Sequence, residues 1–175
     1  MPLYLIELKP AEATRESVGD LIEKVVSAVG SGDGELIETQ VTSDHRIVFV
    51  IVEADSPRFA SPVVKAVEDV AEVTGPDEVR LVGAELDDIK KLKSHADYLV
   101  EWDIPAEITM DQYLARKKAN SPKYAEVPEV SFLRTYVRED TAKCLCFYDA
   151  PDEDAVTRAR AAVQTPIDRL FKLDV

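Results

Sequence analysis

Polar side chains recur at alternate positions of several otherwise apolar stretches of this 175-residue sequence. Glu101 and Asp103 lie in one such stretch, and Arg134 and Tyr136 lie in another. Because side chains alternate between the two faces of a β-strand, each pair shares one face of a predicted strand. Buried charges are costly unless they are paired or bind a ligand. The pattern leaves two interpretations: a polar cavity that binds a small molecule or ion, or wet strand ends at which Arg134 pairs with Glu101 or Asp103.

The candidate binding set follows from the strand faces once each hairpin is taken as symmetric about its turn. Arg134 then lies opposite Cys146, and Phe132 lies opposite Tyr148. The residues at the intervening positions of these strands are nearly all apolar, and we expect their side chains to face the helices. A shift of one residue in any strand would exchange its two faces. The ligand-binding residues predicted in this way are Glu101, Asp103, Arg134, Tyr136, Cys146, Tyr148, Glu7 and Glu38.

The two cysteines, Cys144 and Cys146, are two residues apart in an apparent strand. This spacing suits neither a disulfide framework nor a zinc site. The thiols are interpreted as small packing groups, with a reactive thiol near Arg134 as the alternative. No catalytic residue is assigned, although an enzyme could use the acidic pair or Tyr136 for acid–base chemistry.

An internal repeat places the candidate residues in equivalent halves of the chain. The first two pairs of matching blocks are Tyr4-Leu-Ile-Glu7 with Tyr98-Leu-Val-Glu101, and Thr39-Gln-Val-Thr-Ser-Asp44 with Thr135-Tyr-Val-Arg-Glu-Asp140. Four pairs of blocks in one order favour a duplication over two unrelated modules. We therefore predict a first module over residues 1–86, a linker over 87–96 and a second module over 97–175.

Each half is expected to have the element order β-α-β-β-α-β. In the first half, the predicted strands are Leu3–Leu8, Glu35–Val41, Arg46–Glu53 and Glu78–Val82. Its helices are predicted to begin after Thr14 and at Ser61-Pro62, and to end near Gly30 and Gly75-Pro76. In the second half, the predicted strands are Asp97–Asp103, Val130–Val137, Lys143–Tyr148 and a last strand that ends at Leu173. Its helices are predicted to begin after the capping residues Thr109 and Asp152.

The predicted fold class is α+β, a tandem ferredoxin-like (βαββαβ)2 chain with two antiparallel four-stranded sheets. In such a module one sheet face carries both helices and the other face is bare. We expect the two bare faces to meet, so that the chain forms a single-chain α/β-barrel pseudo-dimer.

The second half also resembles a known family. The residues that carry the resemblance are Tyr98-Leu-Val-Glu-Trp-Asp-Ile-Pro105, Thr135-Tyr-Val137 and Cys146-Phe-Tyr-Asp-Ala-Pro151. They are similar to a family of small bacterial ferredoxin-like domains of unknown function that includes a nickel-binding protein. The resemblance implies the same fold, with nickel as the cofactor. Arg134 and Ala159 replace two histidines of the family pattern, and imidazole is a usual nickel ligand, so we expect weak or absent nickel binding and assign no metal ligand.

The composition restricts the partners. The chain has 34 acidic and 21 basic residues, a net charge of -13, which disfavours binding to nucleic acid or to an anionic membrane. We expect a cytoplasmic protein, either a monomer as a pseudo-dimer or a homo-oligomer, whose partner is a small molecule or metal ion. The predicted function is small-ligand or divalent-metal binding in a polar cavity between the sheets. The alternative is a cofactor-free isomerase or monooxygenase of the dimeric α/β-barrel type.

Overall fold

The computed structural model describes residues 1–91 and 96–174, so part of the predicted linker, 92–95, lies outside the described residues. The chain divides into two compact units. The first comprises Met1–Val79, a segment that begins at Leu86, and Asp174. The second comprises Arg80–Glu85 and the chain that ends at Leu173. The module boundaries predicted from the sequence stay predictions.

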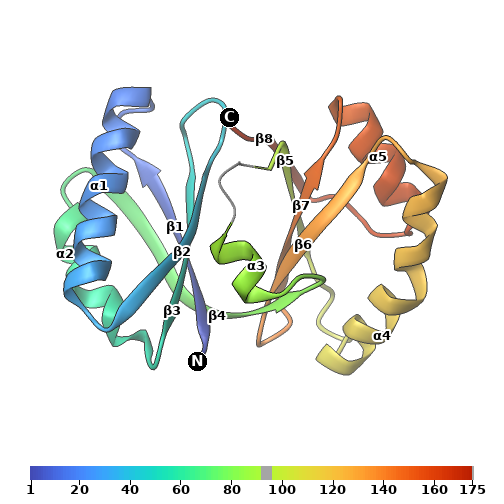
Figure 1. Cartoon of the computed structure of the whole chain (residues 1–175), viewed down its shortest axis with the longest axis horizontal. Coiled ribbons are helices and arrows are strands. Elements are labelled where there is room, and N and C mark those ends of the chain that lie inside the picture. Colours follow the sequence, from blue (N-terminus) through green and yellow to red (C-terminus); the bar gives the residue numbers. More distant parts are fainter. Residues whose placement is uncertain (92–95, 175) are drawn as a thin grey trace. The chain divides into compact units, whose positions relative to one another are not determined.

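The first unit is built on an antiparallel sheet. Its elements are β1 (Leu3–Pro10), α1 (Arg15–Ser31), β2 (Gly34–Val41), β3 (Val48–Ala54), the 3-10 helix η1 (Pro57–Phe59), α2 (Ala60–Val67), most of β4 (Ala71–Val82) and α3 (Leu86–Lys90). Hydrogen-bonded neighbours follow the order β2-β3-β1-β4. Helices α1 and α2 lie on one face of this sheet (Figure 1).

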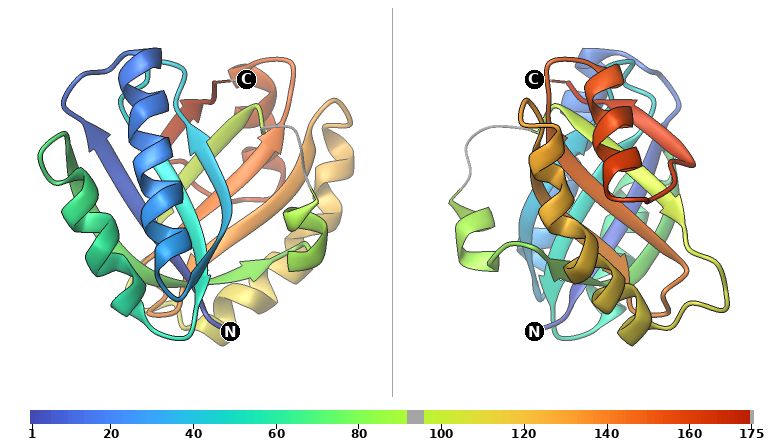
Figure 2. Two further views of the ribbon diagram at one scale, coloured as in Figure 1. Left: turned by 60° about the vertical axis from the view of Figure 1, so that its left-hand side comes forward. Right: turned by 90° about the vertical axis from the view of Figure 1, so that its right-hand side faces the viewer.

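The second unit has the same element order. Its elements are β5 (Tyr98–Asp103), α4 (Met110–Asn120), the 3-10 helix η2 (Ser121–Glu126), β6 (Ser131–Arg138), β7 (Lys143–Asp149), α5 (Glu153–Ala162) and β8 (Arg169–Lys172). Hydrogen-bonded neighbours follow the order β6-β7-β5-β8, and the pairs are antiparallel. Helices α4 and α5 lie on one face of the sheet, as the right-hand view of Figure 2 shows. The expected mixture of helices with antiparallel sheet is confirmed.

The helix starts follow the capping residues predicted from the sequence. The Thr14 side chain accepts a hydrogen bond from the Ser17 backbone N–H at the start of α1. Thr109 and Gln112 form a reciprocal capping box at α4, and Asp152 caps α5. These short side chains satisfy backbone N–H groups that have no partner within the helix.

The second helix of the first unit is shorter than predicted. We expected it to continue to Gly75-Pro76, but α2 ends at Val67 and β4 begins at Ala71. Ala71 pairs with Pro10 and Val73 pairs with Leu8 in the ladder between β1 and β4. Sheet pairing therefore overrides the local helical pattern of this segment.

A β-bulge in each unit corrects the predicted strand faces. The register shifts between Phe132 and Arg134 in β6, so Arg134 pairs with Phe147 and not with Cys146. The predicted pairing of Phe132 with Tyr148 is correct, but from Arg134 toward the turn the assumed symmetric pairing is wrong by one residue. The faces of β7 are therefore exchanged relative to Arg134. As a result Cys146 and Tyr148 pack on the helix side, opposite to the face expected for them.

The first unit has its bulge at the equivalent place, between Leu36 and Glu38 of β2. Val48, Val50 and Val52 of β3 join the core beneath α1 and α2. Glu38 pairs with Ile51 on the sheet face away from α1 and α2, the face expected for it.

Each unit has its own hydrophobic core between its sheet and its helices. In the first unit, strand residues such as Ile6 and Val50 pack against Leu21, Val25 and Val63 of α1 and α2. In the second unit, the core contains tyrosine, tryptophan and cysteine side chains, and some of them also line the pocket described below. In the described part of the chain, no helix is long and apolar enough to cross a membrane.

Candidate functional site

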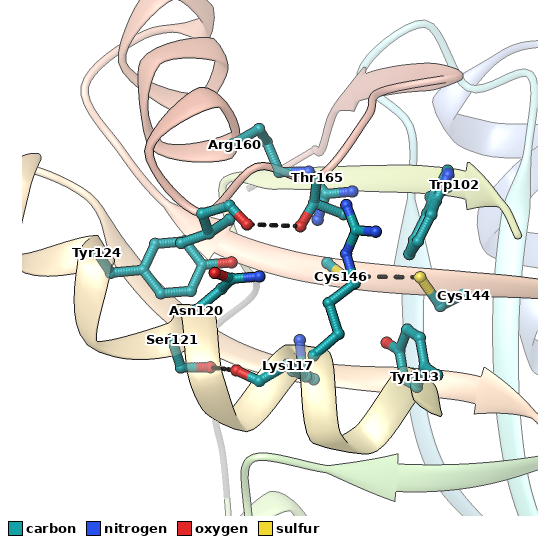
Figure 3. A pocket seen from close by; sticks show the side chains of 12 residues that line it. Trp102, Tyr113, Lys117, Asn120, Ser121, Tyr124, Cys144, Cys146, Arg160 and Thr165 are labelled. Atoms are coloured by element: carbon teal, nitrogen blue, oxygen red, sulfur yellow. Dashed lines mark hydrogen bonds between the residues drawn. The ribbon is translucent and has the colours of Figure 1, made fainter. Parts of the chain in front are cut away.

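A small pocket lies within the second unit, between the sheet and the helices that cover it. We call it the thiol pocket; side chains of β5, β7, α4 and α5 line it, together with residues after these helices: Trp102, Tyr113, Arg116, Lys117, Asn120, Ser121, Tyr124, Cys144, Cys146, Arg160, Val163 and Thr165 (Figure 3). Its volume is about 20 Å³. A cavity of that size holds about one water molecule.

The floor of the thiol pocket is β7. Cys144 and Cys146 are both buried and point to the same side of the strand, with their Sγ atoms 4.0 Å apart (Figure 3). Thr135 of β6 pairs with Cys146, and its hydroxyl donates a hydrogen bond to the Cys146 sulfur over 3.1 Å. Trp102 of β5 pairs with Cys144 on the other side. The two thiols therefore occupy a fixed position between neighbouring strands.

Arg160 of α5 places a positive charge in the wall of the thiol pocket. Only 2% of its surface is exposed. Its Nη1 donates to the Tyr148 hydroxyl over 3.1 Å, and its Nη2 donates to the Pro166 carbonyl over 2.6 Å. Its Nε is buried and has no hydrogen-bond partner among the described residues. A buried guanidinium without a carboxylate partner is costly, so a counter-anion is expected nearby.

Helix α4 adds cations and aromatic rings around the opening. The Lys117 Nζ lies 4.3 Å from the centroid of the Phe132 ring, and the Arg116 guanidinium lies 5.4 Å from that of Trp102. These contacts hold the two long side chains over aromatic faces. No carboxylate is among the residues that line the pocket. The pocket is thus basic although the chain as a whole is acidic.

The electrostatics of the pocket distinguish its two thiols. The hydrogen bond from Cys144, the charges of Lys117 and Arg160 and the hydrogen bond from Thr135 hold the pKa of Cys146 well below its usual range, although burial acts in the opposite direction. The hydrogen bond to Cys146, together with burial, raises the pKa of Cys144. Of the two thiols, Cys146 is thus the one whose surroundings favour loss of the proton.

Two tyrosines adjoin the thiols and stay protonated. The Tyr124 and Tyr148 hydroxyl oxygens are 2.6 Å apart. Burial raises the pKa of Tyr124 to about 12, and burial with the nearby Cys146 charge raises the pKa of Tyr148 well above its usual value. At neutral pH these phenols are neutral hydrogen-bonding groups and supply no counter-charge for Arg160.

The predicted acidic residues of the second unit lie together, on the sheet face away from α4 and α5. Glu101 is 3% exposed and pairs with Arg169 of β8, while its other oxygen lies 3.4 Å from the Lys143 Nζ. Arg169 also donates to Asp103 over 2.9 Å. These two carboxylates thus share one cation, and that cation comes from a residue that the sequence reasoning did not select.

Arg134 and Tyr136 also lie on the helix-free face and are buried. The Arg134 guanidinium lies 4.8 Å from the centroid of the Phe147 ring, and the Tyr136 ring meets the same ring edge-on at 5.9 Å. The pairing of Arg134 with Glu101 or Asp103 stays a prediction. The strand register places Tyr136, rather than Arg134, in line with Glu101.

Glu7 and Glu38 belong to the first unit. Glu7 pairs with Phe49 in the sheet, and Glu38 accepts a hydrogen bond from the Gln40 side chain over 2.9 Å. Within its own unit each candidate lies on the predicted face. Cys146 and Tyr148 are the candidates that the structure moves to the other face, where they join the thiol pocket and its surroundings.

Sequence reasoning missed the residues that give the pocket its charge, Arg160 and Lys117. A signal was available for Arg160, because it follows Val156 by four residues and so lies on the inner stripe of α5. An arginine at such a position is buried and needs a reason. The sequence gives no comparable signal for Lys117. The next residue, Lys118, is also a lysine, and residue type alone does not distinguish the two.

Nickel does not fit the groups found here. In the described part of the chain, no cluster of three or more His, Cys, Asp or Glu side chains is placed to hold a metal ion. The nearest to a donor set is the pair of thiols, but Arg160 and Lys117 place positive charge beside it. Their charge would repel a dication. Weak or absent nickel binding stays a prediction.

Residues 98–173 match the model of the nickel-responsive SCO4226-like protein family, so the resemblance inferred from the sequence is confirmed for that segment. The crystal structure of SCO4226 from Streptomyces coelicolor A3(2) is 18% identical, with 46% of this chain and 98% of that chain covered and a TM-score of 0.40. No curated protein matches the chain.

Solved structures that cover nearly the whole chain share its fold. A candidate chlorite dismutase is 14% identical, with 100% of this chain and 96% of that chain covered and a TM-score of 0.57. A candidate monooxygenase from Fusobacterium nucleatum subsp. nucleatum is also 14% identical, with 99% and 92% covered and a TM-score of 0.55. At these identities the likeness concerns the fold and not the chemistry.

Proposed function

We propose that this protein binds a small anionic ligand in the thiol pocket of its second unit. The observation that carries the proposal is the Arg160 Nε, a buried charged donor without a partner among the described residues. Unsatisfied buried donors are rare in native proteins, and at a pocket wall they indicate a missing acceptor. An anionic oxygen would satisfy both the hydrogen bond and the charge.

The surroundings of Arg160 support an anion over a cation or an apolar ligand. Lys117 and Arg116 add positive charge at the same pocket, and its lining contains no carboxylate. Low dielectric around the buried guanidinium strengthens its attraction for an anion. The volume of about 20 Å³ restricts the enclosed part of the ligand to a very small group. The ligand is thus a small inorganic anion, or the carboxylate end of a larger molecule whose remainder lies outside.

The single tryptophan of the chain gives a direct test, because Trp102 lines the pocket. The full chain is titrated with sodium formate, while the sodium salt of a bulky sulfonate keeps the ionic strength constant. We expect a saturable change in Trp102 fluorescence. A change that is linear in formate, and equal to that of free tryptophan, would contradict the proposal.

Adjacent lysines on α4 supply a matched control. Lys117 lines the pocket, whereas Lys118 is exposed and does not. Lys117→Gln should weaken formate binding by about tenfold, the effect of losing one charge-assisted interaction. Lys118→Gln changes the net charge equally and should leave the affinity unchanged. Equal weakening by both variants would assign the effect to overall charge.

A second candidate function is cofactor-free catalysis of the isomerase or monooxygenase kind. The observation that favours it is the likeness in fold to candidate monooxygenases. Its reacting groups would come from the helix-free face of the second unit, with Glu101, Asp103 or Tyr136 as acid or base. Such an enzyme would lose turnover in Glu101→Gln while it kept formate binding in the thiol pocket.

A separate proposal concerns how the chain is organised. We propose that the two units are tandem ferredoxin-like modules, supported by their shared element order, strand order and bulge position. The meeting of the sheet faces away from α1 and α2 and away from α4 and α5, and hence a monomeric pseudo-dimer, stays a prediction. Two free buried cysteines suit a reducing compartment, which supports a cytoplasmic protein.

A further inference from the structure

A hydrogen-bonded chain of three side chains, Arg160, Tyr148 and Tyr124, ends at the lining of the thiol pocket. On the basis of the anion site proposed above, we propose that the Tyr124 hydroxyl is the second hydrogen-bond donor to the bound anion, beside the Arg160 Nε. The bound group is then a carboxylate. Both the further binding residue and the class of ligand follow from the direction in which these hydrogen bonds run.

The Tyr148 hydroxyl has two partners, and one arrangement of protons satisfies all three groups. A guanidinium only donates, so the Arg160 Nη1 donates to the Tyr148 oxygen over 3.1 Å. Tyr148 is fully buried, and among the described residues its proton has one acceptor, the Tyr124 oxygen at 2.6 Å. If Tyr124 donated instead, the Tyr148 proton would be buried without a partner, which is costly. Tyr148 therefore donates to Tyr124.

This direction leaves the Tyr124 proton available. The Tyr124 oxygen accepts from Tyr148, and its own proton has no acceptor within the described part of the chain. Tyr124 is half-buried and lines the pocket, whereas Tyr148 does not line it. Burial raises the pKa of Tyr124 to about 12, so the hydroxyl keeps its proton at neutral pH. The free O–H thus belongs to the tyrosine that a ligand can reach.

The guanidinium strengthens Tyr124 as a donor. The hydrogen bonds run in one direction from Arg160 through Tyr148 to Tyr124, and in such a chain each bond polarises the next hydroxyl. Arg160 and Tyr124 both contact the Tyr148 hydroxyl, so the free O–H lies close to the guanidinium. The Nε of that guanidinium has no partner among the described residues. One small anion can therefore accept from both residues.

Two other hydroxyls of the lining are already used by the backbone. Ser121 donates to the Lys117 carbonyl over 2.6 Å, and Thr165 donates to the Val163 carbonyl over 3.2 Å (Figure 3). Their protons point away from a ligand. Among these three lining hydroxyls, that of Tyr124 is the one whose proton is free for an anion.

Two neighbouring donors of different kinds favour a carboxylate. Each of its two oxygens can accept one charge-assisted hydrogen bond, one from the Arg160 N–H and one from the Tyr124 O–H. A monatomic anion offers both donors a single centre. A tetrahedral oxyanion adds two further oxygens, for which an enclosed volume of about 20 Å³ has no room.

The test compares formate with chloride in the Trp102 titration, using the full chain and Tyr124→Phe at constant ionic strength. The substitution removes the hydroxyl and keeps the ring that stacks on Phe132. We expect wild type to bind formate more tightly than chloride. Tyr124→Phe should weaken formate binding by about tenfold, the effect of losing one hydrogen bond to a charged group, and should change chloride binding much less.

Tyr98→Phe is the matched control, because Tyr98 belongs to the same core and does not line the pocket. It should leave the affinity for both anions unchanged. An unchanged formate affinity in Tyr124→Phe, or equal weakening for formate and chloride, would overturn the proposal. Weakening of formate binding by Tyr98→Phe as large as that by Tyr124→Phe would overturn it as well, since the effect would then come from the core.

A measurement on the wild-type chain does not depend on how the variants fold. With 13C at the Cζ atoms of the six tyrosines, we expect an NMR resonance to shift downfield as formate is added, with the dissociation constant of the Trp102 response. Tyrosine resonances that stay unchanged while that response saturates would overturn the proposal. If wild type fails to bind formate, the anion site itself fails. If wild type and Tyr124→Phe bind formate equally, the anion site stands and the role of Tyr124 fails.

Discussion

At the level of residues, each face of the sheet in the second unit contains a buried charged side chain, but the two side chains have different surroundings. On the helix side Arg160 is buried without a carboxylate partner among the described residues, near two buried thiols and two neutral phenols. On the helix-free face Glu101 is buried with cations around it. The first arrangement leaves binding capacity open, whereas the second supplies its own partners.

Removing the Glu101 charge should therefore destabilise the fold. Glu101→Gln removes the carboxylate that Lys143 and Arg169 share. Glu101 is buried, but the Arg169 side chain is 45% exposed and water screens part of the interaction, so the loss should be about 2 kcal/mol in the free energy of unfolding. Asp103→Asn is the matched control, since Asp103 is 55% exposed and its pairing is screened by water. It should cost less than about 1 kcal/mol. Urea unfolding of both variants makes the comparison, and equal losses would contradict it.

Tyr124 should make the protein sensitive to alkali. Its pKa is raised to about 12 in the folded state, while the unfolded value is near 10. Above pH 10 the unfolded chain releases this proton and the folded chain keeps it, so the unfolded state binds fewer protons and stability falls as pH rises toward 12. Urea unfolding at pH 9, 10 and 11 should show a smaller decline for Tyr124→Phe than for wild type. An identical decline would show that Tyr124 is not responsible.

At the level of elements, α4 presents Tyr113 and Lys117 to the pocket, and its start depends on one capping box. Thr109→Ala removes the hydrogen bond to the Gln112 backbone and should cost about 1 kcal/mol in the free energy of unfolding. Thr109→Ser keeps the hydroxyl and should be close to wild type. Thermal or urea unfolding of the pair provides the measurement. A loss in Thr109→Ser as large as that in Thr109→Ala would assign the effect to the methyl group instead.

The elements also explain which parts of the fold could be predicted. Thr14, Thr109 and Asp152 identified their helices correctly because capping is a local interaction written in neighbouring residues. The bulge between Phe132 and Arg134 has no such local signal, and one extra residue exchanged the faces of Cys146 and Tyr148. The predicted candidate site was consequently divided between two faces, while Glu101, Asp103, Arg134 and Tyr136 kept theirs.

At the scale of the whole molecule, the two units have the same order of strands and of main helices. The units share more than strand order: the hairpin turns place His45 and Thr141 at φ 61° and 59°, and Asp44 and Asp140 accept backbone hydrogen bonds at the same offset. The two units nevertheless differ in chemistry. Val48 and Val50 of the first unit occupy the positions of Cys144 and Cys146 in the second, so only the second unit has thiols at this place.

The central claim is that Arg160 in the second unit is an anion receptor, and NMR observes its free donor directly. The Nε–H resonance is assigned by its loss in Arg160→Lys and is then followed while sodium formate is added to the full chain. We predict a saturable downfield shift of this proton, with the same dissociation constant as the Trp102 titration, as the Nε–H begins to donate to the anion. An Nε–H resonance that stays unchanged while formate saturates the fluorescence response would contradict the account.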